Sequence, residues 1–208
     1  MGARGPVHRL KRAVLDARER YGQRYAFVHI NKTGGTSIVR ALGMRFQHRT
    51  AAEMRAKLGD RRWERRFTFS VVRNPWDRAV SLYHFRVDTD QTGLGDGRLS
   101  FPDWAVAVYR DRDPELRDKP RMFAPQTWWL AGADGRPDVD RVARFERLGA
   151  DFDDICRRIG VRAELPHLKA SRRGDYRRYY TPAAHDAVAD AFASDIAEWG
   201  YRFDPDAR

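Results

Sequence analysis

Two short apolar runs dominate the hydrophobic pattern of the chain, and a polar turn and a segment with helical spacing follow each of them. The runs cover residues 25–30 and 67–72, and both are rich in aromatic and β-branched residues. Runs of this kind are typical of strands buried in a parallel sheet. The segments that begin at Thr36 and Pro75 carry apolar residues at helical spacing. The pattern therefore predicts two strand–turn–helix units.

The rest of the chain continues the alternation of strands and helices. It predicts a basic helix over 7–22, a brief strand over 44–48, a helix capped by Thr50 and Glu53, a third strand over 140–146, an amphipathic helix over 148–159 and a last helix over 182–199. Residues 88–100 are rich in Gly and Asp and predict either a flexible lid or an idle surface loop. This order indicates an α/β fold, and 208 residues suit a single domain over 1–208.

The turn after the first strand has the residues of an anion-binding loop. Lys32 precedes Gly34 and Gly35, and the hydroxyl residues Thr36 and Ser37 open the helix. Backbone N–H groups and the helix dipole converge on such a loop, and the lysine adds a full positive charge. The sequence predicts a phosphate-binding loop, with a glycine-rich turn beside a solvated lysine as the alternative.

The position of the lysine differs from that of a nucleotide triphosphatase. A Walker A loop places its lysine after the last glycine, whereas Lys32 comes before both glycines. The second strand also ends in Arg73, where a P-loop triphosphatase needs an acidic metal ligand. Ligands of open α/β sheets bind at the carboxyl ends of the strands. The two turns therefore predict one ligand with two separate phosphate groups and no metal.

The composition of the chain is strongly basic. The chain holds 40 Lys and Arg against 29 Asp and Glu, a net charge of +11, which favours an anionic ligand such as a nucleotide, a nucleic acid or an acidic glycan. Its single cysteine, Cys156, excludes an intrachain disulfide and suits a reducing compartment, so we expect a cytoplasmic protein. No apolar run is long enough to span a bilayer.

The two turns resemble the cofactor loops of sulfotransferases that use 3′-phosphoadenosine 5′-phosphosulfate (PAPS), particularly the carbohydrate group that includes heparan sulfate 2-O-sulfotransferase. FVHINKTGGTSI (27–38) resembles the loop that binds the 5′-phosphosulfate. FSVVRNPWDRAVSLYHF (69–85) resembles the loop that binds the 3′-phosphate through an Arg and a Ser eight residues later, the separation of Arg73 and Ser81. Asn31 stands where the family often has Pro.

The resemblance implies a three-layer αβα fold with a central parallel sheet, of the P-loop-like nucleotide-binding type. It also implies a cofactor site, PAPS with product PAP, and no metal. The implied cofactor-binding residues are Lys32, Thr33, Gly34, Gly35, Thr36, Ser37, Arg73, Ser81 and, in a late basic loop, Lys169, Ser171 and Arg172. Lys32 is also the implied catalytic group that stabilises charge on the leaving oxygen.

Transfer to an alcohol also needs a base for the hydroxyl proton, and six histidines compete for that role. His48 follows the first helix and matches the family's His-x-Ser/Thr pattern as His48-Arg49-Thr50, so we expect it to be the base. A capping or surface histidine is the alternative reading of His48. His84 and His167 are the next candidates, and His29 reads as a hydrogen-bonded histidine of the core.

The sequence thus predicts a PAPS-dependent sulfotransferase that acts on a hydroxyl acceptor, with a carbohydrate favoured by the resemblance and no nucleic-acid partner. A nucleotide kinase or other P-loop triphosphatase is one alternative. A basic nucleic-acid-binding module without catalysis is the other, and it would bind through salt-sensitive phosphate contacts. The sequence leaves the acceptor, the sulfated position and the oligomeric state open.

Overall fold

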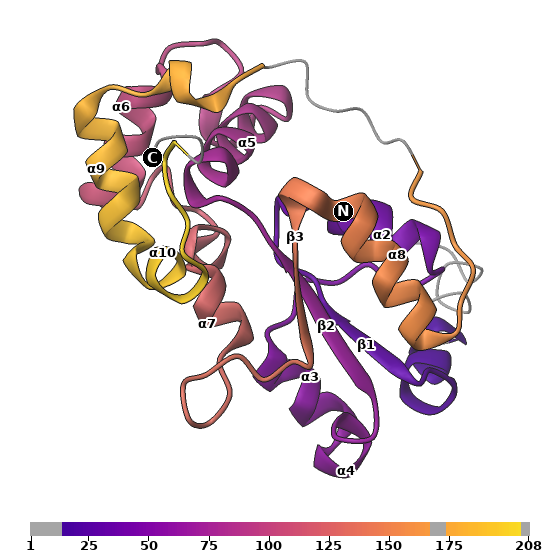
Figure 1. Ribbon diagram of the computed structural model, residues 1–208. Helices are drawn as coiled ribbons and strands as arrows, with labels where there is room; N and C mark the ends of the chain where they lie inside the picture. The colour runs from indigo at the N-terminus through magenta and orange to yellow at the C-terminus, as the bar shows by residue number, and fades with distance from the viewer. Residues whose placement is uncertain (1–13, 167–173, 205–208) are drawn as a thin grey trace. The chain divides into compact units, whose positions relative to one another are not determined.

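The computed structural model describes residues 14–166 and 174–204, and these residues form two compact units (Figure 1). The first unit lies within Met1–Val71 and Leu130–Leu168, and the second within Val72–Trp129 and Lys169–Arg208. The single domain expected over 1–208 stays a prediction.

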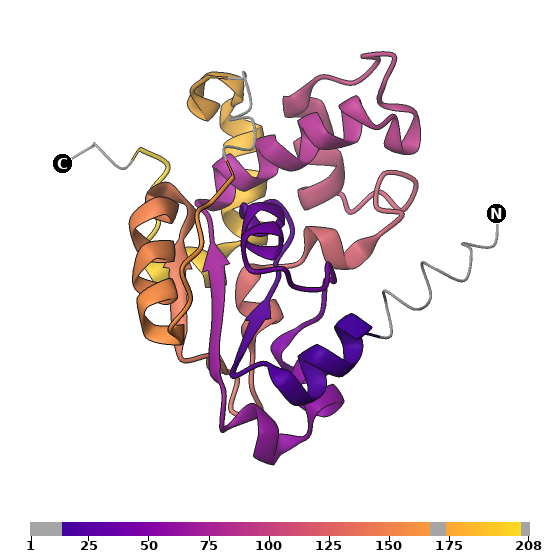
Figure 2. The same ribbon diagram turned by 90° about the vertical axis from the view of Figure 1, so that its right-hand side faces the viewer.

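The first unit contains a three-stranded sheet in the order β1 (Tyr25–Val28), β2 (Phe67–Val72, whose last residue belongs to the second unit) and β3 (Arg141–Arg144). β1 and β2 pair in parallel, with Tyr25 opposite Phe67 and Val28 opposite Ser70 (Figure 2). All of β1, and β2 beyond its first residue, are buried. Both faces of these strands are therefore covered, as their unbroken apolar runs predict.

The helices of this unit are η1 (Arg18–Gly22), α2 (Gly35–Ala41), α3 (Ala51–Leu58), α4 (Asp60–Trp63), η5 (Phe145–Arg147) and α8 (Leu148–Ile159). α2 and α8 cover one face of the sheet, where Ile38 and Phe152 pack with Phe27 and Phe69 (Figure 1). The α/β class, with a central parallel sheet flanked by helices in a P-loop-like arrangement, is confirmed. Cys156 lies in the same core, and burial raises the pKa of its thiol.

The segment between α2 and α3 differs partly from the prediction. The capping box is present, since Thr50 Oγ1 accepts from the Glu53 amide at 3.1 Å and Glu53 Oε2 accepts from the Thr50 amide at 2.9 Å. The strand predicted over 44–48 is wrong, because this extended segment joins no sheet. Instead, Arg45 pairs with Asp16 on the helix before β1.

The second unit is helical. Its elements are α5 (Pro75–Asp88), η2 (Gln91–Gly93), α6 (Phe101–Ala105), η3 (Val106–Arg110), η4 (Pro120–Phe123), α7 (Gln126–Leu130, whose last residue belongs to the first unit), η6 (Tyr176–Tyr179), α9 (Pro182–Ala191) and α10 (Ala193–Trp199). The helix predicted over 182–199 divides at Phe192, whose φ of −119° leaves the helical range and whose buried ring packs 5.1 Å from Tyr109. Residues 88–100 hold η2, and their role as a lid stays a prediction.

Buried arginines on α5 tie this unit together. Arg78 donates to the Ala124 carbonyl at 3.0 Å and lies 5.5 Å over the Phe192 ring. Arg86 pairs with Asp118 at 2.7 Å. Because a buried guanidinium is costly unless its donors are satisfied, these contacts fix the 116–124 segment against α5.

Candidate active site

The loop between β1 and α2 turns sharply through two left-handed residues. Gly34 has a φ of 80°, and Lys32, which is not a glycine, has a φ of 64°. Left-handed backbone at a residue with a Cβ is uncommon and concentrates at functional sites. Thr33 is fully buried, and its Oγ1 donates to the Ile30 carbonyl at 2.9 Å. This bond closes the turn, and the predicted role of Thr33 in binding the cofactor stays a prediction.

Both glycines of the loop are required by close packing. A Cβ on Gly34 would lie 2.8 Å from Leu148 Cδ2, and one on Gly35 would lie 2.1 Å from Cδ2 of His29. Real Cβ atoms do not come this close to their neighbours. The loop backbone is thus held against the imidazole of His29 below it and the start of α8 beside it.

The donors of this loop fit an anionic group. The N-cap of α2 is Gly34, which has no side chain to accept from the first N–H groups of the helix, and the first turn holds no acidic residue. Thr36 is exposed, while Ser37 and Lys32 are half-buried. Backbone N–H groups, hydroxyls and an ammonium make a donor set for phosphate or sulfate oxygens. Lys32, Gly34, Gly35, Thr36 and Ser37 lie together in this loop, and their role in binding the cofactor stays a prediction.

His48 lies at the carboxyl end of β1, as predicted. Its Nδ1 is 2.9 Å from the backbone carbonyl oxygen of His29, three residues before Lys32. A carbonyl can only accept, so Nδ1 of His48 carries the proton and donates. In the neutral ring, Nε2 then holds the lone pair. The half-buried His48 is thereby oriented by its backbone partner in the tautomer that a general base needs.

His29 is the second imidazole of the pair. Its ring is 3% exposed, and its centroid lies 4.3 Å from that of His48. Burial, with a smaller contribution from the charge of His48, lowers the pKa of His29 to about 3. The expected core position of His29 is confirmed, but its Nδ1 finds no hydrogen-bond partner within residues 14–166 and 174–204. His29 is thus a neutral ring that supports both Gly35 and His48.

In the second unit, Arg73 follows β2 directly and its backbone is held by one side chain. The amide of Gln126 accepts from the Arg73 N–H and donates to the Arg73 carbonyl, both at 2.8 Å. Asp195 accepts from the backbone N–H of Gln126 at 2.8 Å and from its Nε2 at 3.1 Å. Gln126 and Asp195 are fully buried. The buried network of Gln126 and Asp195 therefore fixes the backbone of Arg73 at the end of β2.

The side chain of Arg73 is largely buried and pairs with Asp77, whose Oδ2 lies 2.7 Å from Nε. Ser81 stands one further helical turn along α5, is half-buried, and makes no hydrogen bond through its hydroxyl within the described residues. Arg73, Asp77 and Ser81 thus follow one another at intervals of four, on neighbouring turns. The i,i+4 spacing of Arg73 and Asp77 was a signal in the sequence for this pair.

The turn at Asn74 is anchored to the end of the chain. Asn74 Oδ1 accepts from the Trp76 amide at 3.1 Å and caps α5, while its Nδ2 donates to the Arg202 carbonyl at 2.8 Å. Tyr180 OH donates to the Trp76 carbonyl at 2.8 Å. The local sequence does not predict these partners, because they lie more than a hundred residues away.

The remaining predicted residues are placed as follows. Lys169, Ser171 and Arg172, together with His167, lie outside the described residues. His84 on α5 contacts the Tyr179 ring edge-on, at 5.2 Å between centroids. Lys32 and Arg73 belong to different compact units, so the geometry of each loop stands by itself.

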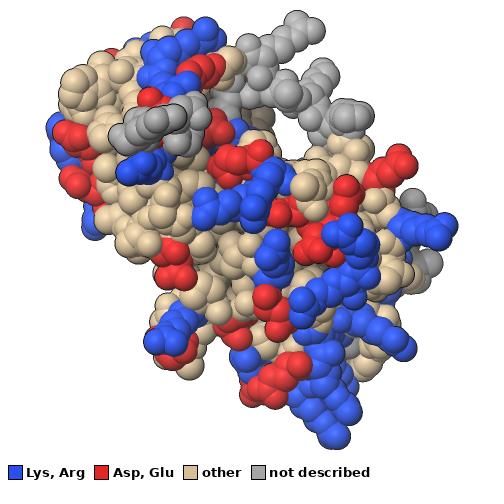
Figure 3. Space-filling view, viewed as in Figure 1, with Lys and Arg blue, Asp and Glu red and all other residues tan. Residues whose placement is uncertain are grey.

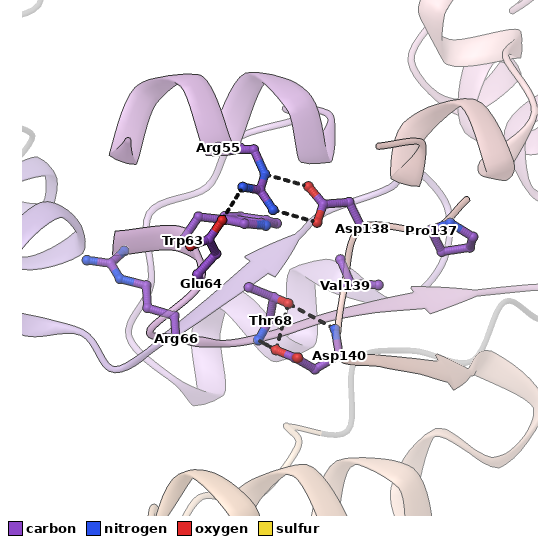
Figure 4. Close-up of a pocket in the computed structure, with 9 residues that line it drawn as sticks. All are labelled: Arg55, Trp63, Glu64, Arg66, Thr68, Pro137, Asp138, Val139 and Asp140. Carbon is purple, nitrogen blue, oxygen red and sulfur yellow. Dashed lines mark hydrogen bonds and ion pairs between the residues drawn. The ribbon is translucent and has the colours of Figure 1, made fainter. Parts of the chain in front are cut away.

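A polar cavity of about 290 Å³ lies at the other end of the strands, where β2 and β3 begin (Figure 4). Arg55 donates two hydrogen bonds of 2.8 and 3.0 Å to the carboxylate of Asp138. These bonds hold the pKa of that carboxyl below its usual range. Thr68 and Asp140 exchange hydrogen bonds of 2.7 to 2.9 Å. None of the predicted site residues lines this cavity. The hydrogen bonds between Thr68 and Asp140 join the start of β2 to the start of β3.

Within the described part of the chain, no group of three or more His, Cys, Asp or Glu residues is arranged to hold a metal ion. No helix there has the length and apolar character needed to cross a membrane.

Comparison with known proteins gives two matches. The model of the Sulfotransferase family matches residues 22–198. The crystal structure of a sulfotransferase from Alicyclobacillus acidocaldarius aligns with 86% of this chain and 96% of its own, at 16% sequence identity and a TM-score of 0.49. A search of the curated proteins finds none that matches.

Proposed function

The chain belongs to the sulfotransferase family, and we propose that its donor is PAPS and its acceptor a hydroxyl group of a carbohydrate. The family match supports sulfuryl transfer in general. The two loops support the donor, because they offer separate cationic sites at the ends of adjacent strands. The resemblance of 27–38 and 69–85 to the carbohydrate group, including heparan sulfate 2-O-sulfotransferase, supports the acceptor. The lone buried Cys156 supports the cytoplasm as its compartment.

The first loop would hold the 5′ end of the donor. When bound, PAPS supplies an activated sulfuryl group on a phosphate leaving group. The N–H groups of the loop and the hydroxyls of Thr36 and Ser37 bind its oxygens, and Lys32 places a positive charge where the leaving oxygen gains negative charge. His48 takes the acceptor's proton at Nε2. His29 orients His48 through its carbonyl oxygen.

The second loop would hold the 3′-phosphate. Arg73 donates charge-assisted hydrogen bonds, and Ser81 donates from its hydroxyl. Gln126 fixes the backbone from which Arg73 extends. We retain Lys169, Ser171 and Arg172 as further contacts to the 3′ side on the resemblance alone.

One observation carries the proposal: the loop that holds Lys32 runs into a helix whose N-cap is Gly34, and its Gly35 packs on His29, whose carbonyl accepts from His48. This arrangement joins an anion site to an oriented base at the end of one strand. A triphosphatase would place its lysine on the helix instead.

The nucleic-acid alternative has its own support. Residues 61–66, which include the end of α4, carry the exposed side chains of Arg61, Arg62 and Arg65, and basic side chains gather at the α4 end of the first unit in Figure 3. Such a patch attracts phosphate backbones without any chemistry.

Thermal unfolding with PAP, ATP or a single-stranded oligonucleotide separates these readings, because a specific ligand stabilises the folded state by mass action. We expect PAP to raise Tm more than ATP, and the oligonucleotide effect to vanish at high salt. Transfer from radiolabelled PAPS to a panel of sugars then tests the reaction. Stabilisation by ATP with Mg²⁺ but not by PAP would overturn the proposed donor.

A further inference from the structure

The extended segment over 44–48 directs its side chains alternately to two sides. Arg45 pairs with Asp16, and Gln47 donates to Glu19, a carboxylate only 4% exposed on the helix before β1. The alternate residues, Phe46 and His48, contact the ring of His29 instead. Because a shift of one residue would exchange the two sets, these contacts fix the register of the segment and the position of Phe46.

Phe46 is an exposed aromatic ring beside the base. Its centroid lies 5.0 Å from that of His29 and 5.1 Å from that of His48, with interplanar angles of 88° and 80°. The ring nevertheless leaves 55% of its surface exposed. A single exposed aromatic residue is ordinary on a protein surface. Phe46 differs because partly buried polar contacts of its two neighbours hold it against the ring of His48.

We propose that Phe46 is the aromatic platform of the acceptor site, on which the C–H face of a pyranose ring rests while one of its hydroxyls meets His48. This inference rests on the proposed function and names the acceptor as a cyclic sugar. The face of an aromatic ring carries partial negative charge, which attracts the partly positive C–H groups of a sugar face. A small acyclic alcohol has no such face, so it gains little from Phe46.

The test compares binding and turnover in three proteins: wild type, Phe46→Leu and Phe46→Tyr. Leucine keeps the apolar character without the aromatic face, and tyrosine restores that face. The binding probe is saturation-transfer NMR with methyl β-D-glucopyranoside and methyl β-D-galactopyranoside, and sorbitol serves as the acyclic control. Binding is measured without PAPS, so it does not depend on activity.

We expect Phe46→Leu to weaken pyranoside binding, and to raise the acceptor KM, by roughly twofold to tenfold. Phe46→Tyr should retain wild-type values. The thermal shift produced by PAP should be the same in all three proteins. Tyr21→Leu is the matched control, since Tyr21 is an exposed aromatic residue of the same unit whose ring lies beneath Arg62; it should leave pyranoside binding unchanged.

The outcomes separate this inference from the proposed function. Equal pyranoside binding by wild type and Phe46→Leu, or no pyranoside binding by wild type, overturns the platform. Tighter Phe46-dependent binding of 4-nitrophenol than of either sugar overturns the assignment to a cyclic sugar. Phe46-dependent sugar binding without any transfer from PAPS supports the platform and contradicts the proposed reaction.

Discussion

The two loops that follow β1 and β2 are built in different ways. The Lys32 loop takes its shape mainly from chain neighbours, namely two left-handed residues, a buried Thr33 hydroxyl and Gly35 packed on His29, while Gly34 packs on Leu148 of α8. Arg73 takes its position from residues about 50 and 120 positions away, Gln126 and Asp195. The first loop is therefore specified mainly by local sequence, and the second mainly by tertiary structure.

This difference has a consequence for function. Substitutions at the first loop act on the groups that would handle the transferred sulfuryl group and the acceptor proton. Substitutions far from Arg73 in sequence act on the second loop through its backbone. If the two loops act separately, substitutions in the first loop should change the rate of transfer, and substitutions around the second loop should change the recognition of the 3′-phosphate.

The largest effect is expected at His48. If its Nε2 takes the acceptor proton, His48→Ala should lower the single-turnover rate by about 10² to 10⁴, while PAP affinity stays near that of wild type. The rate of wild type should rise with pH through a proton-transfer limb, and that limb should disappear in the variant.

The matched control for His48 is Thr50→Ala, which removes the neighbouring helix cap but no imidazole. Loss of the cap should cost about 0.5–2 kcal/mol of stability and leave the rate nearly unchanged. A His48→Ala protein that behaves like Thr50→Ala, losing stability but little rate, is a structural histidine rather than the base.

The next effect is expected at Arg73. A charge-assisted hydrogen bond contributes ~1.5–3 kcal/mol, so Arg73→Ala should weaken PAP by roughly tenfold to a hundredfold. Adenosine 5′-phosphosulfate, which lacks the 3′-phosphate, should bind equally to both proteins. Isothermal titration with the two nucleotides measures this difference, and equal losses for both would show that Arg73 does not read the 3′-phosphate.

The first loop also predicts a dependence of stability on pH. The folded pKa of His29 is about 3, below its ordinary value near 6.5, because its ring is buried. Between these two values the unfolded chain binds the extra proton, so stability falls as pH falls from about 6.5, by up to ~1.4 kcal/mol per pH unit. Urea unfolding of wild type and His29→Gln at pH 7, 6 and 5 measures this.

His29→Gln removes the titratable imidazole, so the free energy of unfolding should decline less steeply with falling pH than it does in wild type. The slope of wild type contains contributions from every acid of the chain, so the difference between the two proteins is the relevant quantity. Parallel curves for the two proteins would mean that His29 keeps an ordinary pKa and does not lie buried against Gly35.

The sequence predicted the local features of this fold well. The apolar runs predicted β1 and β2, the Thr50 and Glu53 pattern predicted the cap of α3, and the amphipathic pattern predicted α8. Each of these depends on residues within a few positions of one another. The extended segment over 44–48 misled, because strand-like residues require a partner strand that periodicity alone does not reveal.

The site could be predicted only where its residues form short motifs in the sequence. Lys32 and the two glycines form one short motif, and His48 was placed correctly at the end of β1. The amide pairing of Gln126 with Arg73 was not foreseen, since a buried glutamine far along the chain has no local signature. The tautomer of His48 depends on a single carbonyl oxygen, which only the folded structure places.

The smallest effect, and the sharpest test of the comparison, concerns Gln126. Gln126→Met keeps the size of the side chain but removes both hydrogen bonds to the Arg73 backbone. We expect PAP affinity to fall by about threefold to tenfold, relative to adenosine 5′-phosphosulfate, because a net hydrogen bond contributes ~0.5–1.5 kcal/mol.

Thr127→Val is the matched control for Gln126→Met. It removes the 3.0 Å bond from the Thr127 hydroxyl to Asp195 but leaves the Gln126 amide bonded to Arg73. Both variants should lower Tm, since both disturb the buried carboxylate, but only Gln126→Met should change the ratio of the two nucleotide affinities. If the ratio shifts equally in both, the network acts through general stability. If it shifts only in Gln126→Met, a residue 53 positions from Arg73 helps set the 3′-phosphate site.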